Sequence, residues 1–467
     1  MSACPLTRQA SHLEVYDPQD GSLIATVPRA TGAEVEVAIS RAVLAREVAR
    51  NVPAHRRTSV LRKASDIVEA RSEKFAQTIA REGVKAIREA RREVCRCVQT
   101  LRLSAEEASR LTGETIPFDR FPGSEKRLGY MFHEPVGIVV AITPFNDPLN
   151  LVAHKVGPAI AAGNAVIVKP HEETPLSALL LAQAIGEAGL PEDICQVLVG
   201  SGEELGHPLV SDSRVRMVSF TGGRETGASI VRSAGIKKIS MELGGNCPTI
   251  ILNDADLDRA VADCTSGAFA AAGQNCLHVQ RIIIQSKVYD EFAERFVSAA
   301  KNCKTGNKLD EATEIGPLIN QVAAARIEET IREAMLAGAM LLAGGQRNGA
   351  FYEPTVLEDV PPSARVYREE IFGPVTTLER VANLDEALKR ANAVDFGLHS
   401  AIFTRDVGCA FEAVRRLQAG SVIVNGSTDY RDDGMPFGGL KGSGVGREGV
   451  RFAVMEMTEP KVVCFNL

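Results

Sequence analysis

Three residues of different chemical type stand where they could perform acyl chemistry together. Cys276 follows Gly273-Gln274-Asn275 at an expected helix-to-strand corner, where nearby backbone N–H groups favour a nucleophilic thiolate. Glu242 ends an expected buried strand, and burial raises the pKa of a carboxyl group toward the range of a general base. Asn146 follows another strand, and its amide could donate a hydrogen bond to a developing oxyanion. Each also has a structural interpretation, as a buried thiol, a residue before a tight turn or a turn residue.

Glycines mark two further places in the chain. Gly244 and Gly245 directly follow Glu242, and they permit a close approach of ligand to backbone or a positive φ. Residues 444–449 spell G-x-G-x-x-G, the dinucleotide-binding fingerprint. Because no apolar strand precedes them and no βαβ unit surrounds them, we expect a packed glycine-rich turn near the catalytic entrance instead.

The pattern of apolar residues indicates which elements position these groups. Between Ala33 and Leu111 it predicts helices, whereas from Gly129 onward short apolar strands alternate with helices, as in a doubly wound parallel sheet. The predicted helices are Val35 to Val48, His55 to Glu82, Ile87 to Leu111 and Leu149 to Ala162, and the predicted strands are Gly137 to Ile142, Ala165 to Val168, Gln196 to Val199, Met217 to Phe220 and Ile236 to Met241.

A second alternating region runs from Pro248 to about Asn425 and predicts a second α/β domain. It opens with a strand, Thr249 to Leu252, and a helix, Asp256 to Ala271. The segments Thr115 to Met131 and Phe452 to Leu467 carry strand-forming residues with little helical pattern. We expect these two segments to form a small protruding sheet that pairs subunits.

Composition excludes several classes of function. The 53 basic and 59 acidic side chains give a net charge of -6 without a long basic stretch, which argues against a nucleic-acid partner. The longest nearly uninterrupted apolar run, Val136 to Ile142, is far below the roughly 20 residues of a membrane span, and the start of the chain shows no secretory pattern. We therefore expect no membrane partner and a cytoplasmic location. We also expect reduced cysteines and no metal site, because Cys95 and Cys97 lack further zinc ligands.

Seven short motifs, in this order, make the chain resemble the aldehyde dehydrogenase superfamily over nearly its whole length. Glu242 and Cys276 also lie 34 residues apart, which is the separation in that family. The motifs are Pro144-Phe145-Asn146, Lys169-Pro170 with Glu172, Phe220-Thr221-Gly222, Glu242-Leu243-Gly244-Gly245, Gly273-Gln274-Asn275-Cys276, Glu370-Ile371-Phe372-Gly373-Pro374 and Pro436-Phe437-Gly438-Gly439.

The resemblance implies an α/β fold with three parts. A Rossmann-like cofactor domain would comprise residues 1–114 and 132–245, and a second α/β catalytic domain residues 246–425. Residues 115–131 and 446–467 would form a small protruding oligomerisation sheet, in a homodimer or a homotetramer.

The resemblance also implies NAD(P)-dependent oxidation of an aldehyde to a carboxylate. Cys276 would attack the aldehyde carbon, and Asn146 with the Cys276 N–H would stabilise the alkoxide. Loss of hydride would leave a thioester, and Glu242 would activate water to hydrolyse it.

The cofactor would be NAD, with NADP possible. The resemblance implies that Lys169 and Glu172 contact the adenosine ribose. It also implies that Glu370 and Phe372 hold the nicotinamide ribose and ring. A carboxylate at 172 accepts hydrogen bonds from a free 2′-hydroxyl but repels a 2′-phosphate, so NAD is preferred. The expected cofactor-binding residues are Thr143, Pro144, Phe145, Lys169, Glu172, Phe220, Thr221, Gly222, Gly223, Leu243, Gly244, Glu370 and Phe372.

The expected substrate is a short polar or anionic aldehyde, of which phosphonoacetaldehyde, glyceraldehyde 3-phosphate, lactaldehyde and sulfonated analogues are examples. Arg431 and His154 resemble positions of the family branch that handles such aldehydes, and a guanidinium suits an anion because it offers a planar fork of donors. Alternatively, Arg431 pairs only with Asp432 or Asp433. The expected substrate-binding residues are Arg102, His154, Asn275 and Arg431, with His278 as a further candidate.

Two other activities would use the same nucleophile. A CoA-acylating aldehyde dehydrogenase passes its thioester to a thiol, but a water-activating Glu242 would waste that intermediate. A cysteine esterase or acyltransferase makes an acyl-enzyme without redox chemistry, but it would not need Lys169, Glu172 and Glu370. A catalytically silent relative is a third alternative, which the intact catalytic residues oppose.

Overall fold

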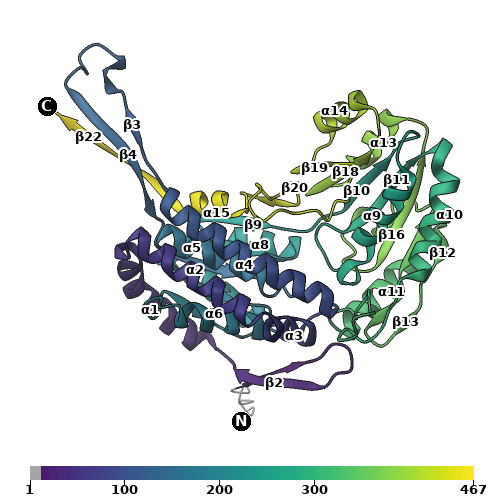
Figure 1. Ribbon diagram of the computed structural model, residues 1–467, viewed down its shortest axis with the longest axis horizontal. Coiled ribbons are helices and arrows are strands. Elements are labelled where there is room, and N and C mark those ends of the chain that lie inside the picture. The colour runs from purple at the N-terminus through teal and green to yellow at the C-terminus, as the bar shows by residue number, and fades with distance from the viewer. Residues whose placement is uncertain (1–11) are drawn as a thin grey trace, which may run out of the picture.

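The computed structural model describes residues 12–467 (Figure 1), so the first eleven residues of the predicted cofactor domain lie outside the described part. The described chain begins with a hairpin and four helices. The predicted helix from His55 to Glu82 is two helices that meet at Arg71, where the residue types carry no glycine or proline to indicate a break. These elements are β1 (His12–Tyr16), β2 (Leu23–Pro28), α1 (Gly32–Asn51), α2 (Ala54–Ala70), α3 (Ser72–Glu82) and α4 (Ile87–Arg110).

The first large sheet has the strand order β21-β9-β8-β5-β6-β7 and is parallel except for β21. Every predicted strand of this region is present, within one or two residues at each end. The strands are β5 (Ile138–Ile142), β6 (Ala165–Lys169), β7 (Cys195–Val197), β8 (Met217–Thr221), β9 (Lys238–Glu242) and β21 (Gly444–Val445), and the helices between them are α5 (Asn150–Ala162), α6 (Leu176–Glu187), α7 (Gly202–Ser211) and α8 (Arg224–Ala234).

Helices cover both faces of this sheet, which explains its uninterrupted apolar strands. Within β5, Val139 and Ala141 pack into one core with α2, α4, α5 and α6, whereas Ile138 and Val140 pack into another with α1, α7 and α8. Successive side chains of a strand point to opposite faces, so a strand that is buried on both sides must be apolar throughout.

The second large sheet has the order β12-β15-β16-β11-β10-β18-β19, and only β12 runs antiparallel to its neighbour. Its core is separate from that of the first sheet. The strands are β10 (Cys247–Ile251), β11 (Val279–Gln285), β12 (Met340–Ala343), β15 (Thr355–Glu358), β16 (Val375–Val381), β18 (His399–Phe403) and β19 (Ser421–Val424), and the helices are α9 (Leu257–Phe269), α10 (Ser286–Asn302), α11 (Gln321–Leu336), α12 (Arg365–Arg368), α13 (Leu384–Ala391) and α14 (Val407–Arg416).

A three-stranded arm, in the order β22-β4-β3, projects away from both halves (Figure 1). It consists of β3 (Glu114–Ile116), β4 (Arg127–Pro135) and β22 (Thr458–Asn466). The strand prediction is wrong for its first part after Phe452, because α15 (Val450–Glu456) buries Val450, Ala453 and Val454 before β22 begins. That short helix contacts α4 and α5 of the first half.

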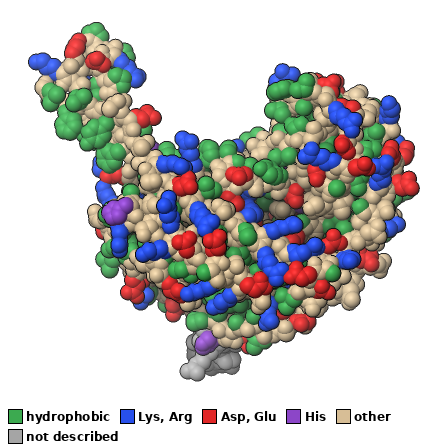
Figure 2. Space-filling view, in the orientation of Figure 1, with side chains coloured by type: hydrophobic (Ala, Val, Ile, Leu, Met, Phe, Trp, Pro, Cys, Tyr) green, Lys and Arg blue, Asp and Glu red, His purple; other side chains and the backbone are tan. Residues whose placement is uncertain are grey.

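The described residues show a surface of mixed charge. On the face shown in Figure 2, Lys and Arg side chains are interspersed with Asp and Glu over the helical layer. Within residues 12–467, no helix is both long enough and apolar enough to cross a membrane. The same residues contain no cluster of three His, Cys, Asp or Glu side chains suited to a metal ion.

Candidate active site

Parallel register brings the ends of four strands to one edge of the first sheet. Ile142 of β5 lies beside Lys169 of β6 and Phe220 of β8, and Thr221 lies beside Glu242 of β9. Ligands of open α/β sheets bind outside the carboxyl ends of the strands, which is this edge. The loops that carry Asn146, Glu172 and Gly222 also begin here.

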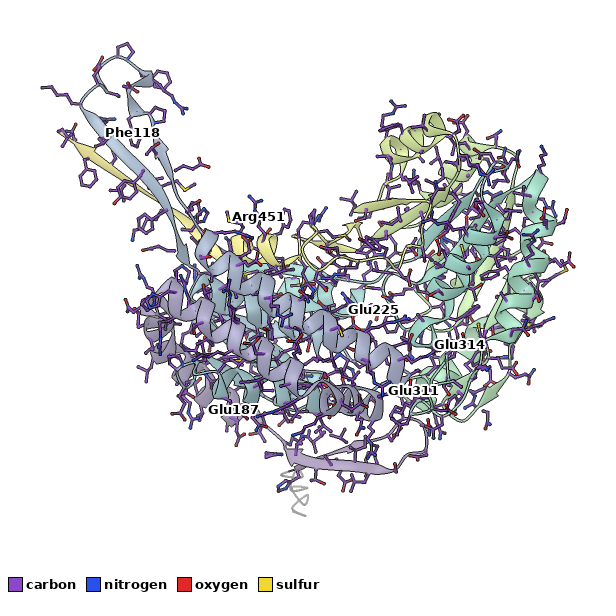
Figure 3. The ribbon with its side chains drawn as sticks, in the orientation of Figure 1. Phe118, Glu187, Glu225, Glu311, Glu314 and Arg451 are labelled. Carbon is purple, nitrogen blue, oxygen red and sulfur yellow. The ribbon has the colours of Figure 1, made fainter. Side chains whose placement is uncertain are left out.

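A cavity of about 1690 Å³ opens at that edge and extends to residues of the second half. Cys276, Glu242 and Asn146 all line it, together with Asn275, Glu370 and Phe372. Figure 3 shows Glu225, another lining residue at the start of α8, between the two halves of the molecule. The three residues that the sequence singled out for acyl chemistry therefore share one cavity.

Cys276 lies between the short helix η2 (Ala270–Gly273) and β11, partly exposed to the cavity. The Sγ of the neighbouring Cys247 donates to the Cys276 carbonyl oxygen at 3.5 Å, and Asn275 Oδ1 accepts from the N–H of Leu277 at 3.0 Å. Burial and then the Glu370 charge raise the pKa of the Cys276 thiol, while Arg431 acts in the opposite direction. The resting side chain is therefore a thiol, and it needs a proton acceptor or a nearby cation to react.

Glu242 is 2% exposed, and neither of its carboxyl oxygens has a hydrogen-bond partner among the described residues. Burial and then the Glu448 charge raise the pKa of Glu242 well above its ordinary value, against the cations Arg431, Lys155 and Arg447. Gly438 leaves room for this side chain, because a Cβ there would lie 2.8 Å from Glu242 Oε1. A buried carboxyl with free oxygens can exchange a proton with a ligand or with water.

Glu448 is a cavity residue that the sequence reasoning missed. Lys155 Nζ lies 2.6 Å from Glu448 Oε1, and Arg431 Nη2 donates to Glu448 Oε2 at 3.2 Å. Although burial opposes it, the charges of Lys155 and Arg431 lower the pKa of Glu448 to about 2. The signal in the sequence was the position of Glu448 within the G-x-G-x-x-G segment, residues 444–449. In the structure the backbone of Glu448 forms hydrogen bonds with that of Phe437. Glu448 and Glu242 thus differ in ionisation although they line the same cavity.

Arg431 does reach the cavity, and its side chain is 7% exposed. Its guanidinium carbon lies 3.7 Å above the ring of Phe437. The alternative that Arg431 pairs only with Asp432 or Asp433 is wrong, because its partner is Glu448. Asp433 instead binds Arg96 at 2.7 Å and His154 at 2.9 Å.

Arg102 and His154, which we expected to bind the substrate, do not line this cavity. Arg102 donates to Glu69 of α2 at 2.6 Å, outside the cavity lining. His154 is fully buried and bonded to Asp433, so it holds the loop before Gly434 rather than a ligand. Helical geometry explains the first error: Arg96, six residues earlier on α4 and therefore about 240° around the helix, lines the cavity instead.

His278, the further candidate, is also outside the cavity lining. It is 3% exposed, and burial lowers its pKa to about 4, so it is neutral at physiological pH. Asn275 lines the cavity as expected, next to Cys276.

The expected cofactor residues line the other part of the same cavity, so the residues present fit a dinucleotide. Lys169, which is 5% exposed, and Glu172 lie at the end of β6, and Gly222 and Gly223 lead into the first turn of α8. Backbone N–H groups at such a helix start suit phosphate oxygens.

Glu370 and Gly244 lie against each other in the cavity lining. The N–H of Gly245 donates to Glu370 Oε1 at 3.0 Å, and any side chain at Gly244 would collide with the Glu370 carboxyl. Burial raises the pKa of Glu370 to about 7. Phe145 packs edge-on against Phe372 with ring centres 5.6 Å apart, and both rings line this part of the cavity.

Comparison with known proteins agrees with this geometry. Residues 6–463 match the model of the aldehyde dehydrogenase family. Aspartate-semialdehyde dehydrogenase 1 of Pseudomonas canavaninivorans is 50% identical over 456 residues, which are 98% of this chain and 97% of that protein.

Two solved structures are also similar along nearly the whole chain. Aldehyde dehydrogenase 21 of Physcomitrella patens, crystallised with its reaction product succinate, has a TM-score of 0.96 and 41% identity over 99% of this chain and 96% of its own. Glyceraldehyde-3-phosphate dehydrogenase GapN of Methanocaldococcus jannaschii, complexed with NADP, has a TM-score of 0.94 and 39% identity over 99% of this chain and 100% of its own. The chain therefore belongs to the aldehyde dehydrogenase family, whose members are NAD(P)-dependent enzymes that oxidise aldehydes.

Proposed function

We propose that this enzyme oxidises a short aldehyde with a distal anionic group to the corresponding carboxylic acid, through a thioester on Cys276. The observation that carries the proposal is the shared cavity, in which Cys276, Glu242 and Asn146 occur together with the arginines 96 and 431.

The covalent steps follow from the three cavity residues. The Cys276 thiol releases its proton to solvent, and the thiolate attacks the aldehyde carbon while the Asn146 amide donates to the oxygen that becomes negative. Glu370 and Phe372 would hold a nicotinamide in this cavity, and the bound group would supply an acceptor for the hydride of this carbon. Glu242 then removes a proton from the water that attacks the thioester and passes it to the departing sulfur, so that the acid and the Cys276 thiol are released.

The anionic part of the substrate is recognised by guanidinium groups. Arg431 is pre-oriented by Phe437 and Glu448, and Arg96 is pre-oriented by Asp433. Their fixed donors match the oxygens of a carboxylate, sulfonate, phosphonate or phosphate. The names of the similar proteins support an anionic aldehyde, since aspartate semialdehyde, succinate and glyceraldehyde 3-phosphate all carry such a group.

NAD is the preferred cofactor of this chain. Glu172 lines the cavity at the end of β6 and offers a carboxylate that accepts from a ribose 2′-hydroxyl. The same carboxylate repels a 2′-phosphate, whereas the nearby Lys169 attracts it. The first half then serves as the cofactor domain and the second half as the catalytic domain.

The arm pairs subunits in a homodimer or a homotetramer. β22 is an edge strand of the arm, and it exposes Val462 and Phe465 beside Leu128 and Tyr130 of β4. An unpaired edge with exposed apolar side chains requires a covering partner.

A panel of aldehydes, assayed with NAD and with NADP by absorbance at ~340 nm, tests the proposal. Succinate semialdehyde and glyceraldehyde 3-phosphate should exceed propanal in kcat/KM, and Cys276→Ala should abolish every activity while Cys95→Ser, an exposed cysteine, should leave them unchanged. Propanal oxidised as well as the anionic aldehydes would remove the substrate class, and turnover by Cys276→Ala would remove the nucleophile.

A further inference from the structure

The segment before Cys276 has an unusual backbone. Ala271 (φ 50°, ψ 33°), Ala272 (φ 54°, ψ 38°) and Gly273 (φ 68°) are three successive left-handed residues. Glycine adopts this conformation freely, but alanine does so at a cost in energy, because its Cβ crowds the following carbonyl. Contacts from outside the segment must therefore hold the two alanines.

Glu89, in the first turn of α4, supplies one of these contacts. Its Oε1 accepts from the N–H of Ala271 at 2.9 Å, and its Oε2 accepts from the N–H of Ala86, which caps α4, at 3.2 Å. The carboxylate thus bridges the start of a helix in the first half and the start of the η2 turn in the second half.

Gln274 supplies the contacts at the other end of the turn. Its Nε2 donates to the carbonyl of Ala271 at 3.1 Å and to that of Pro317 at 3.3 Å, and its Oε1 accepts from the N–H of Ile319 at 2.9 Å. The side chain is 1% exposed, so these hydrogen bonds do not compete with water.

The start of α4 is itself held against the second half. Ile87 N–H donates to the Lys308 carbonyl at 2.7 Å, Arg88 donates to the Thr313 carbonyl at 3.3 Å, and Arg91 pairs with Glu311 at 2.5 Å. Figure 3 shows Glu311 and Glu314 where α4 reaches the second half. The first turn of α4, which carries Glu89, is therefore attached to the second half of the molecule close to η2.

We propose that Glu89 is a positioning residue: it holds Ala271 and Ala272 in the left-handed conformation, so that the Cys276 thiol and N–H face the cavity. The proposal rests on the proposed role of Cys276 as the nucleophile. Without the Glu89 carboxylate, the alanines relax toward right-handed or extended backbone, and Cys276 leaves its reactive orientation.

The test compares Glu89→Ala with Glu106→Ala, which removes an exposed glutamate of the same helix that pairs with Arg110. Two rates are measured: alkylation of Cys276 by iodoacetamide without substrate, and the first-turnover burst of NADH. Glu89→Ala should lower both rates about tenfold or more, with little change in KM, since a lost hydrogen bond to a charged group is a change of this order. Glu106→Ala should match the wild type.

A rescue distinguishes positioning from general damage. Replacing both alanines by glycine in the Glu89→Ala background should restore both rates, because glycine reaches positive φ without a holding contact. Wild-type rates in Glu89→Ala, or no recovery in the triple variant, overturn the proposal. If Glu89→Ala does not fold, Glu89→Gln takes its place: it offers one acceptor oxygen to two N–H donors, so it should lower both rates and the two glycines should restore them, whereas wild-type rates in Glu89→Gln overturn the proposal. Alkylation of Cys276 does not require dehydrogenase turnover, so it tests the role of Glu89 by itself. A failure of the proposed function shows in a different measurement, as dehydrogenase activity that survives Cys276→Ala.

Discussion

Arg431 and Glu448 form a hydrogen-bonded ion pair of 3.2 Å at the wall of the cavity, and this pair fixes a guanidinium beside Cys276 and Glu242. The guanidinium carbon of Arg431 also lies 3.7 Å above the centre of the Phe437 ring, so the guanidinium is held from two sides. A side chain that is fixed in this way loses little entropy when a ligand binds.

Arg431→Ala should lower kcat/KM for anionic aldehydes by about 10- to 100-fold, the loss of one hydrogen bond to a charged group. Its effect on propanal should be clearly smaller, because propanal has no anion to bind. Arg102→Ala is the matched control, since Arg102 pairs with Glu69 outside the cavity, and it should leave both values unchanged. Equal losses for charged and uncharged aldehydes in Arg431→Ala would contradict anion recognition.

Lys155→Met should destabilise the fold by about 3–5 kcal/mol, because it leaves Glu448 buried with only one cation. Lys155 is 1% exposed and contacts both Glu448 and Ser219. Chemical denaturation measures the loss. The double variant Lys155→Met/Glu448→Gln should recover part of it, and a double variant as unstable as the sum of both single variants would show that the charge pair is not the cause.

Glu172→Gln should improve the use of NADP relative to NAD. The substitution removes the negative charge near the 2′-position but keeps a hydrogen-bonding oxygen, and Lys169 then faces the phosphate without opposition. The ratio of kcat/KM for the two cofactors is the measurement, with Glu203→Gln, another acidic residue of the cavity lining, as the comparison. A ratio that stays constant would show that Glu172 does not select the cofactor.

Turnover should rise with pH from neutral into the alkaline range. The pKa values of both Glu242 and Cys276 are raised, chiefly by burial, and both groups act in their deprotonated forms. The pKa of Glu448 is about 2, so this residue stays ionised and adds no limb to the profile. A pH series of kcat in a constant-ionic-strength buffer checks the direction, and a profile that falls above neutral pH would contradict it.

The parallel sheet and the shared cavity could be anticipated from the sequence because the apolar strands and the motifs at their ends are local signals. Buried parallel strands leave apolar runs, and parallel register then places Lys169, Thr221 and Glu242 at one edge. Cys276 and Glu370 arrive from the second half, and short motifs identified them without any knowledge of the packing between the halves.

Contacts between side chains that are distant in the sequence could not be predicted from it. Whether Arg96 or Arg102 faces the cavity depends on the rotation of α4 about its axis, which the neighbouring helices determine. Glu448 could not be assigned to the cavity from the sequence, because it comes there through the pairing of β21 with β9. The prediction that His154 projects into the pocket failed because Asp433, nearly 280 residues later in the chain, forms a hydrogen bond with it inside the protein.

The central claim is that Cys276 forms a thioester and that Glu242 directs water onto it. Stopped-flow measurement of NADH with Glu242→Gln is the most direct test, with Cys276→Ala beside it. The account predicts a burst of about one NADH per active site followed by turnover reduced roughly 100-fold or more in Glu242→Gln, and no burst in Cys276→Ala. Wild-type steady turnover in Glu242→Gln, or a burst in Cys276→Ala, would contradict the account.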